Sequence, residues 1–127
     1  MKHESIEFFR AEYPQWWHHK LERFPVGWTD LLAEFFHALD RLNSPTSQHK
    51  VWVTVHFEPS EIGPWTAYIA PIVRMKDWTE GDVLHLIRTV EVFNSGMSRT
   101  CEICGSFISF KSQKPERILC EEHRNAD

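Results

Sequence analysis

The sequence predicts an α+β fold, with N-terminal helices, a β-hairpin and a long helix followed by a small C-terminal module. Two observations predict the body: apolar residues recur at helical spacing in two long stretches, and they alternate with polar residues in a stretch between them. A third observation predicts the module, because every cysteine lies at or after position 101. A chain of 127 residues is long enough for one core. We therefore expect a body over residues 1–98 and a module over residues 99–127.

The N-terminal part is predicted to form two short helices. Ser5 is a suitable N-cap for a first helix that runs to Tyr13, where Pro14 interrupts it. Pro14 itself suits the first turn of a second helix, which we expect over Gln15–Arg23. The Pro25-Val26-Gly27 step then predicts a turn.

A third helix is predicted from Trp28 to Leu42, because its apolar residues recur every three or four positions. After a loop over Asn43–Gln48, the pattern changes to strict alternation over Val51–Phe57, which is typical of a strand with one buried face. Trp65–Val73 then predicts a returning strand, with Pro71 at an edge or a bulge. These segments together predict a β-hairpin.

A long helix is predicted to follow the hairpin. Thr79-Glu80-Gly81-Asp82 resembles a capping box, and a broad apolar face extends from Val83 to Met97. Asn94-Ser95-Gly96 is expected to end this helix, since Asn and Gly favour helix C-termini.

The charge of the chain argues against a nucleic-acid partner. The formal net charge is −4, with 9 Lys/Arg against 13 Asp/Glu in residues 1–98 and 5 against 5 in residues 99–127. This balance repels phosphate backbones. No apolar run approaches the roughly 20 residues that span a bilayer, and the N-terminus has no apolar signal-peptide core, so we expect a cytoplasmic protein with no membrane partner.

The four residues Cys101, Cys104, Cys120 and His123 predict one zinc site. Cys101-Glu-Ile-Cys104-Gly105 is a metal knuckle, and Cys120-Glu-Glu-His123 places a histidine one helical turn after a cysteine. Two such pairs, which use every cysteine of the chain, have the spacing of a zinc site. Four protein ligands leave no position for water or substrate, so we expect a structural Zn²⁺, one per chain, in a treble-clef or zinc-ribbon-like module.

The tail also resembles a known group of proteins. The strings Ser98-Arg-Thr-Cys-Glu-Ile-Cys-Gly105 and Ile118-Leu-Cys-Glu-Glu-His123 are similar to the end of a loose set of small bacterial and prophage-type proteins, which finish in a CEVCG…LCDEH zinc module. In that set a Tyr-Pro segment and a Gly-Trp pair precede the tail, and Tyr13-Pro14 and Gly27-Trp28 look similar. The resemblance implies the zinc and a bacterial or mobile-element setting, and it implies no activity.

Two weaker constellations carry less information. His18, His19 and Glu22 lie within about one helical turn, but no second ligand pair of the HExxH type accompanies them, so an exposed polar face is the better interpretation. His56 and Glu58 fall on one strand face and could act as a base and its orienting group. Nothing marks a nucleophile nearby, and we predict no catalytic residues and no enzyme activity.

Tryptophan and acidic residues favour a protein partner. Trp16 and Trp17 are adjacent, so one of them is expected to be partly exposed if the segment is helical. Exposed Trp is typical of interface hot spots. The predicted partner-binding residues are Trp16, Trp17, Glu12, Glu22, Asp30 and Glu34.

The function that fits these features is a non-catalytic zinc protein that binds another protein, for instance an immunity or inhibitor protein that neutralises a basic toxin enzyme. The alternative is a nucleic-acid-binding or transcription accessory zinc protein of phage or mobile-element origin. The acidic balance ranks this alternative second.

Overall fold

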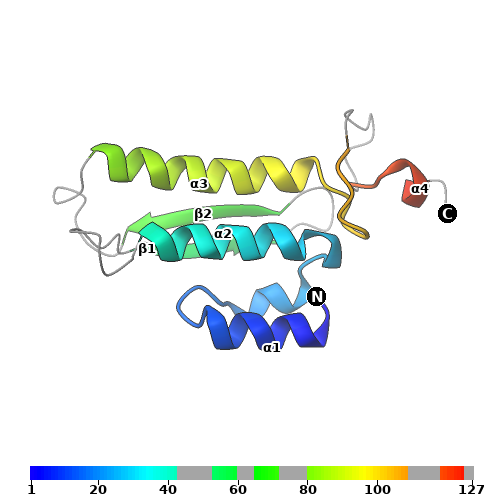
Figure 1. Ribbon diagram of the computed structural model, residues 1–127, viewed down its shortest axis with the longest axis horizontal. Coiled ribbons are helices and arrows are strands. Elements are labelled where there is room, and N and C mark those ends of the chain that lie inside the picture. The colour runs from blue at the N-terminus through cyan, green and yellow to red at the C-terminus, as the bar shows by residue number, and fades with distance from the viewer. Residues whose placement is uncertain (43–52, 60–64, 72–79, 109–117, 125–127) are drawn as a thin grey trace.

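A computed structural model describes residues 1–42, 53–59, 65–71, 80–108 and 118–124 of the chain. These residues form a mixture of helices and strands, which confirms the predicted class at that level (Figure 1). The helices are α1 (His3–Glu12), α2 (Thr29–Leu42), α3 (Glu80–Ser98) and the short α4 (Glu121–Arg124), with 3-10 segments η1 (His19–Arg23) and η2 (Val26–Trp28) between α1 and α2. The strands are β1 (Val53–Glu58) and β2 (Thr66–Pro71).

The start of the chain differs from the sequence-based expectation. Helix α1 begins at His3 rather than at Ser5, and its N-cap Lys2 makes no side-chain capping bond. The helix ends before Tyr13, as expected for a residue that precedes proline. The second predicted helix, Gln15–Arg23, is wrong over its first half.

The physical reason lies at His18, whose backbone is extended. Its Nδ1 accepts the backbone N–H of Lys20 at 3.2 Å, so His18 acts as the N-cap of η1. A capping residue has non-helical backbone angles and starts a new helical segment, so no single helix can run through it.

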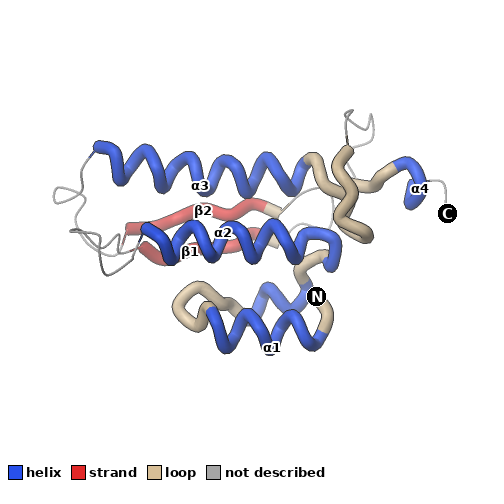
Figure 2. The backbone as a smooth tube through the Cα atoms, viewed as in Figure 1, coloured by secondary structure: helices blue, strands red, loops and turns tan. Residues whose placement is uncertain are grey.

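Helix α2 confirms the prediction to within one residue. Thr29 opens it, and the Thr29 hydroxyl donates to the carbonyl oxygen of Val26 at 2.7 Å. Leu32, Phe35, Phe36 and Leu39 are buried along one stripe, which the helical period predicts. The colours of Figure 1 show that α2 and α3 run in opposite directions, and in Figure 2 the strands appear between these two helices and partly behind α2.

The hairpin is antiparallel, with Phe57 opposite Ala67 and His56 opposite Tyr68. Phe57 and Ala67 are buried, whereas Thr54, His56 and Tyr68 are exposed, so the predicted alternation is confirmed for the described residues. The expected strand residues Val51 and Val73 lie outside the part of the chain that the structure describes.

Helix α3 continues to Ser98, so the prediction that Asn94-Ser95-Gly96 ends it is wrong. The Asn94 carboxamide is used elsewhere: it accepts the backbone N–H of Ala67 at 2.9 Å and donates to the carbonyl oxygen of Ala67 at 3.0 Å. Asn94 thus pairs with the edge of β2 as a neighbouring strand does. Met97, one turn further on, is fully buried, and its packing favours the last turn of the helix. The expected cap residue Thr79 lies outside the described residues.

Aromatic rings make up most of the core. Phe35 and Phe93 stack with ring centroids 4.4 Å apart, and they join α2 to α3. Phe24 contacts Trp65 edge to face at 5.1 Å, which joins the N-terminal segment to the hairpin. Each fully buried ring of this kind stabilises the fold by about 2–3 kcal/mol through its removal from water. None of the described helices combines the length and the apolar character that a bilayer crossing requires.

Candidate metal centre

The first ligand pair lies in a tight backbone knuckle. Gly105 adopts a φ of +78°, which a residue without a side chain reaches at little cost. Its N–H donates to the carbonyl oxygen of Cys101 at 2.9 Å, and the Cys101 N–H donates to the carbonyl oxygen of Ser106 at 2.9 Å. An isolated antiparallel bridge between Thr100 and Phe107 flanks the knuckle. These bonds fix the positions of Cys101 and Cys104.

The second pair is brought to the knuckle by the segment that precedes α4. The N–H of Glu102 donates to the carbonyl oxygen of Ile118 at 2.8 Å, and Leu119 is buried. Cys120 follows at once, immediately before α4, and His123 lies within that helix. The Sγ of Cys120 and the Nδ1 of His123 are 3.1 Å apart.

The four ligand atoms converge as the spacing predicts. All four atoms lie within 4.8 Å of one another, so among the described residues these four form a group that could hold a metal ion. The Sγ atoms of Cys104 and Cys120 are 3.7 Å apart, and the Sγ of Cys101 is 3.5 Å from the Nδ1 of His123. A tetrahedral zinc site requires about 3.8 Å between two sulfurs and about 3.6 Å between sulfur and nitrogen, given Zn–S bonds of about 2.3 Å. The residues therefore fit a single metal ion.

The surroundings act differently on the three thiols. Hydrogen bonds with Ser106, whose Oγ is 3.0 Å from the Cys104 Sγ, lower the pKa of Cys104 to about 7. Burial acts to raise the pKa of Cys101, but hydrogen bonds from the backbone N–H groups of Cys104 and Cys120 outweigh it and lower that pKa. For Cys120 the backbone N–H of His123 acts to lower the pKa, but burial and the neighbouring thiols raise it overall. A metal ion takes up thiolates, so two of the three sulfurs are already biased towards the ligand form.

The knuckle packs directly on the turn before α2. The N–H of Gly27 donates to the carbonyl oxygen of Glu102 at 2.8 Å, and the indole N–H of Trp28 donates to the carbonyl oxygen of Thr100 at 2.7 Å. A Cβ on Gly27 would lie 2.1 Å from the carbonyl oxygen of Cys101, a distance too short for any side chain at this position. The division into residues 1–98 and 99–127 stays a prediction, but the two parts share this interface. In Figure 1 the knuckle lies at the end of the helix pair where α2 begins and α3 ends.

Sequence analysis missed Gly27 and Trp28 as residues of the metal centre. Their link to the cysteines is a contact across 72 residues, so no local pattern reveals it. The available signal was the Gly27-Trp28 pair itself, which stands where the third helix was predicted to begin. The close approach of two backbones explains why a glycine stands there.

The predicted partner-binding residues do not share one environment. Trp16 is buried, and its indole N–H donates to Asp40 at 2.7 Å, so little of this ring is open to a partner. Trp17 is half-buried and stacks on Phe9 with ring centroids 6.3 Å apart. The four acidic residues are exposed, namely Glu12, Glu22, Asp30 and Glu34. Their role in binding stays a prediction.

The two histidine constellations have local explanations. The rings of His18 and His19 lie 4.4 Å apart, and burial, followed by the nearby His19, lowers the pKa of His18. The capping bond described above occupies the Nδ1 of His18. His56 stacks on Tyr68 at 5.1 Å, and its Nε2 is 3.1 Å from the Thr54 hydroxyl on the exposed face of the hairpin.

These observations define a mixed helix-and-strand protein with one Cys₃His group suited to a metal ion. Comparison of the chain with protein-family models, with curated proteins and with solved structures gives no match. The resemblance to prophage-type proteins therefore stays a prediction, and the function has to be argued from the site.

Proposed function

We propose that the metal is zinc and that its role is structural. The observation that carries this proposal is the convergence of the three cysteine sulfurs and one imidazole nitrogen. One of these cysteines, Cys101, is fully buried in a knuckle that packs on the body. Soft thiolate ligands with one imidazole select zinc over harder cations such as magnesium. A tetrahedral ion held by all four residues has no open coordination position, so its contribution is to folding.

Metal analysis of the purified protein tests the zinc proposal. We expect one zinc per chain, which Cys104→Ser and His123→Ala each reduce strongly. Glu122→Ala is the matched control, because it changes an exposed neighbour of His123 and leaves all four ligands in place. Purified protein with another metal at full occupancy would show that the site binds that metal instead of zinc. Ligand variants that retain zinc would refute the assignment of these residues as ligands.

For the whole protein, we propose the binding of another protein, with inhibition of a toxin enzyme as the biological role. The support is the excess of acidic residues in the body, the exposure of Glu12, Glu22, Asp30 and Glu34, and the half-buried ring of Trp17. Exposed carboxylates accelerate encounter with a basic active-site cleft, and an aromatic ring supplies a lasting contact. The metal centre then acts as a scaffold that keeps the tail folded and docked on the body.

Co-expression with the product of the neighbouring gene tests this role. If that gene encodes a toxin, we expect the protein to restore growth, and charge reversal at Glu12, Glu22, Asp30 or Glu34 to weaken the rescue. Added salt is expected to slow association more than it speeds dissociation. Rescue that is lost only when the metal ligands are replaced, and never by the charge reversals, would place the contact elsewhere. Measurable turnover of a small substrate with no protein partner would overturn the proposal.

A further inference from the structure

The three cysteines of the metal centre differ in their exposure to solvent. Cys104 is exposed, Cys120 is half-buried, and Cys101 is fully buried. The backbone N–H groups of Ile103, Cys104 and Cys120 also donate hydrogen bonds to the sulfur of Cys101. A dissolved reagent can therefore contact the sulfur of Cys104 more readily than the other two sulfurs.

Exposure decides which sulfur reacts first, because a bound metal ion holds all three sulfurs as thiolates. The thiolate is the form of cysteine that attacks electrophiles such as peroxides. Oxidation of a cysteine follows its thiolate character and its exposure, and the first product is rescued as a disulfide where a second cysteine lies nearby. Cys104 is the cysteine that meets the condition of exposure.

Cys120 is placed to react with an oxidised Cys104, because their Sγ atoms are 3.7 Å apart. A disulfide requires about 2.05 Å, so the two sulfurs must approach by roughly 1.7 Å, which rotation of the two side chains can supply. Cys101 is the competing partner, but its backbone hydrogen bonds hold its sulfur inside the knuckle. The geometry therefore favours Cys120 as the second member of the pair.

We propose that Cys104 and Cys120 form a peroxide-sensitive pair, whose oxidation to a disulfide releases the metal ion. First, the Cys104 thiolate attacks one oxygen of hydrogen peroxide. The S–O bond forms, the O–O bond breaks and hydroxide leaves, so the peroxide gains the two electrons that the sulfur loses. The Cys120 thiolate then attacks the Cys104 sulfur, the S–S bond forms and a second hydroxide leaves. Protons from the solvent convert both hydroxides to water.

The disulfide removes two of the four ligands from the metal centre. Cys101 and His123 remain, and two ligands do not hold a tetrahedral ion. Loss of the ion should loosen the docked knuckle, and the indole of Trp28 should report this change because it donates to the carbonyl oxygen of Thr100. This inference rests on the proposed structural zinc and adds a reversible oxidised state to it.

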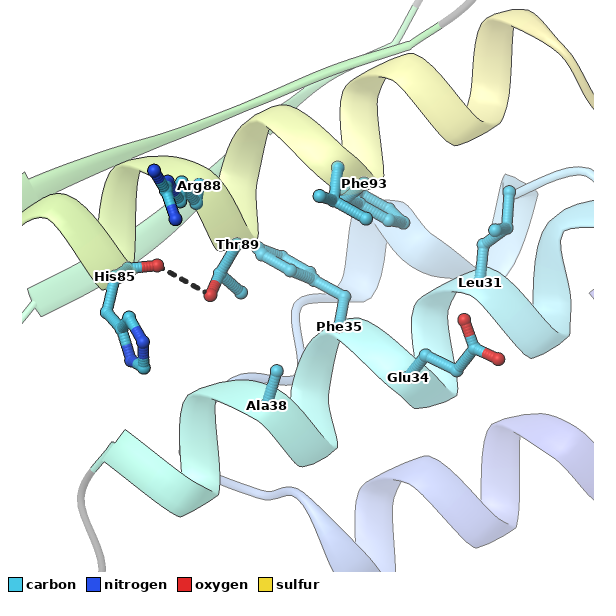
Figure 3. Close-up of a pocket in the computed structure, with 9 residues that line it drawn as sticks. Leu31, Glu34, Phe35, Ala38, His85, Arg88, Thr89 and Phe93 are labelled. Carbon is cyan, nitrogen blue, oxygen red and sulfur yellow. Dashed lines mark hydrogen bonds between the residues drawn. The ribbon is translucent and has the colours of Figure 1, made fainter.

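The helix pair α2–α3 presents no exposed sulfur to a peroxide. Met97, in α3, is fully buried. Figure 3 shows the hollow between the two helices, whose lining includes Leu31, Phe35 and Phe93 but no cysteine or methionine. Oxidation should therefore alter the tail and leave the helical circular dichroism of the body largely unchanged.

Treatment of the zinc-loaded chain with about one equivalent of hydrogen peroxide tests the proposal, since one peroxide oxidises two thiolates. We expect release of the zinc to a chromogenic chelator, loss of two of the three thiols, and a shift of the tryptophan fluorescence. Digestion with trypsin and a glutamate-specific protease separates Cys101 from Cys104 at Glu102, so mass spectrometry can identify the linked cysteines. A Cys104–Cys120 disulfide is expected, and dithiothreitol with added zinc should reverse all of these changes.

Cys104→His separates oxidation from metal binding. An imidazole can replace the exposed thiolate in a Cys₂His₂ ligand set, so zinc should be retained, whereas peroxide should release it at least about tenfold more slowly than from the wild type. Glu122→Ala is the matched control, because it changes an exposed residue beside His123 and leaves every sulfur in place. It should release zinc at the wild-type rate. The mapping of the wild-type disulfide decides the proposal if Cys104→His binds no zinc.

Metal analysis before peroxide is added tests the structural zinc separately. Protein without zinc at that stage refutes the structural role, and the proposed release falls with it. Zinc that is present and stays bound in peroxide overturns the release alone. A disulfide that includes Cys101 also overturns the proposal, as does a zinc-loaded Cys104→His protein that reacts at the wild-type rate.

Discussion

At Gly27 two segments of backbone approach so closely that the identity of one residue decides whether the metal centre can dock. The Gly27 N–H bond to Glu102 does not need a glycine, because any residue except proline supplies that donor. The close approach of the two backbones does require a glycine, because an added Cβ would meet backbone atoms of Cys101 and Glu102. Backbone atoms cannot move away as a flexible side chain can. The cost of a substitution there is therefore steric.

Gly27→Ala is expected to destabilise the protein by about 2 kcal/mol or more, because overpacking against backbone forces a shift of the knuckle. Urea unfolding of the zinc-loaded protein measures this change. Gly81→Ala is the control: Gly81 is an exposed residue in the first turn of α3, where alanine should stabilise by up to about 1 kcal/mol. Equal stability of the Gly27→Ala protein and the wild type would show that the knuckle does not dock as described.

Cys104→Ser removes an exposed ligand, so it changes the metal centre without opening a cavity in the core. We expect loss of zinc and of order in the tail, while most of the helical circular dichroism is retained. Colorimetric zinc release and the far-ultraviolet spectrum together measure this. A complete loss of helix in this variant would contradict the expectation that the aromatic core folds without the metal.

Elements whose form depends on their own residues were predictable, and elements whose form depends on distant contacts were not. Helix α2 and strand β1 carry their period in the sequence, so both were identified. The interrupted second helix and the true end of α3 depend on the His18 cap and on the pairing of Asn94 with Ala67. The convergence of the four candidate metal ligands was predictable because two short spacings encode it. The docking of the knuckle on Gly27 and Trp28 was not, since it joins segments remote in sequence.

Asn94→Ala is expected to loosen the edge of β2. The substitution leaves the N–H and the carbonyl oxygen of Ala67, a buried residue, without their side-chain partner, at a cost of about 1–3 kcal/mol. Hydrogen exchange at the Ala67 amide should speed up accordingly. Ser95→Ala, at an exposed position of α3, should change neither stability nor this exchange rate. An Ala67 amide that stays equally protected in Asn94→Ala would mean that another group pairs with the strand edge.

For the molecule as a whole, the metal centre and the aromatic core are expected to lose stability together. Zinc contributes on the order of 10 kcal/mol to folding in small modules of this kind, and the Trp28 indole bond to Thr100 passes part of this gain to the core. Chelation should lower the thermal midpoint of the helical signal by at least about 5 °C, and it should shift the fluorescence of the tryptophans. A helical midpoint that does not move on chelation would show that the tail is energetically independent.

The charge of the whole chain predicts no useful affinity for nucleic acid. With a net charge of −4, the protein lacks the clustered cations that displace counterions from phosphates. Fluorescence anisotropy with duplex DNA and with RNA at about 150 mM salt should show no submicromolar binding. Tight binding that weakens steeply with added salt would instead favour the accessory-protein alternative.

The bond between Trp28 and Thr100 also orders events in time. It closes a loop of 72 residues, and the entropy of bringing such ends together costs roughly 4 kcal/mol before any contact repays it. The knuckle can therefore pack on the turn before α2 only after α2, the hairpin and α3 have brought Trp28 and Thr100 close together. Docking of the knuckle is then a late step of folding. In the reverse direction, departure of the ion is the natural first step of unfolding. The lifetime of the docked knuckle should then follow the rate at which zinc is lost.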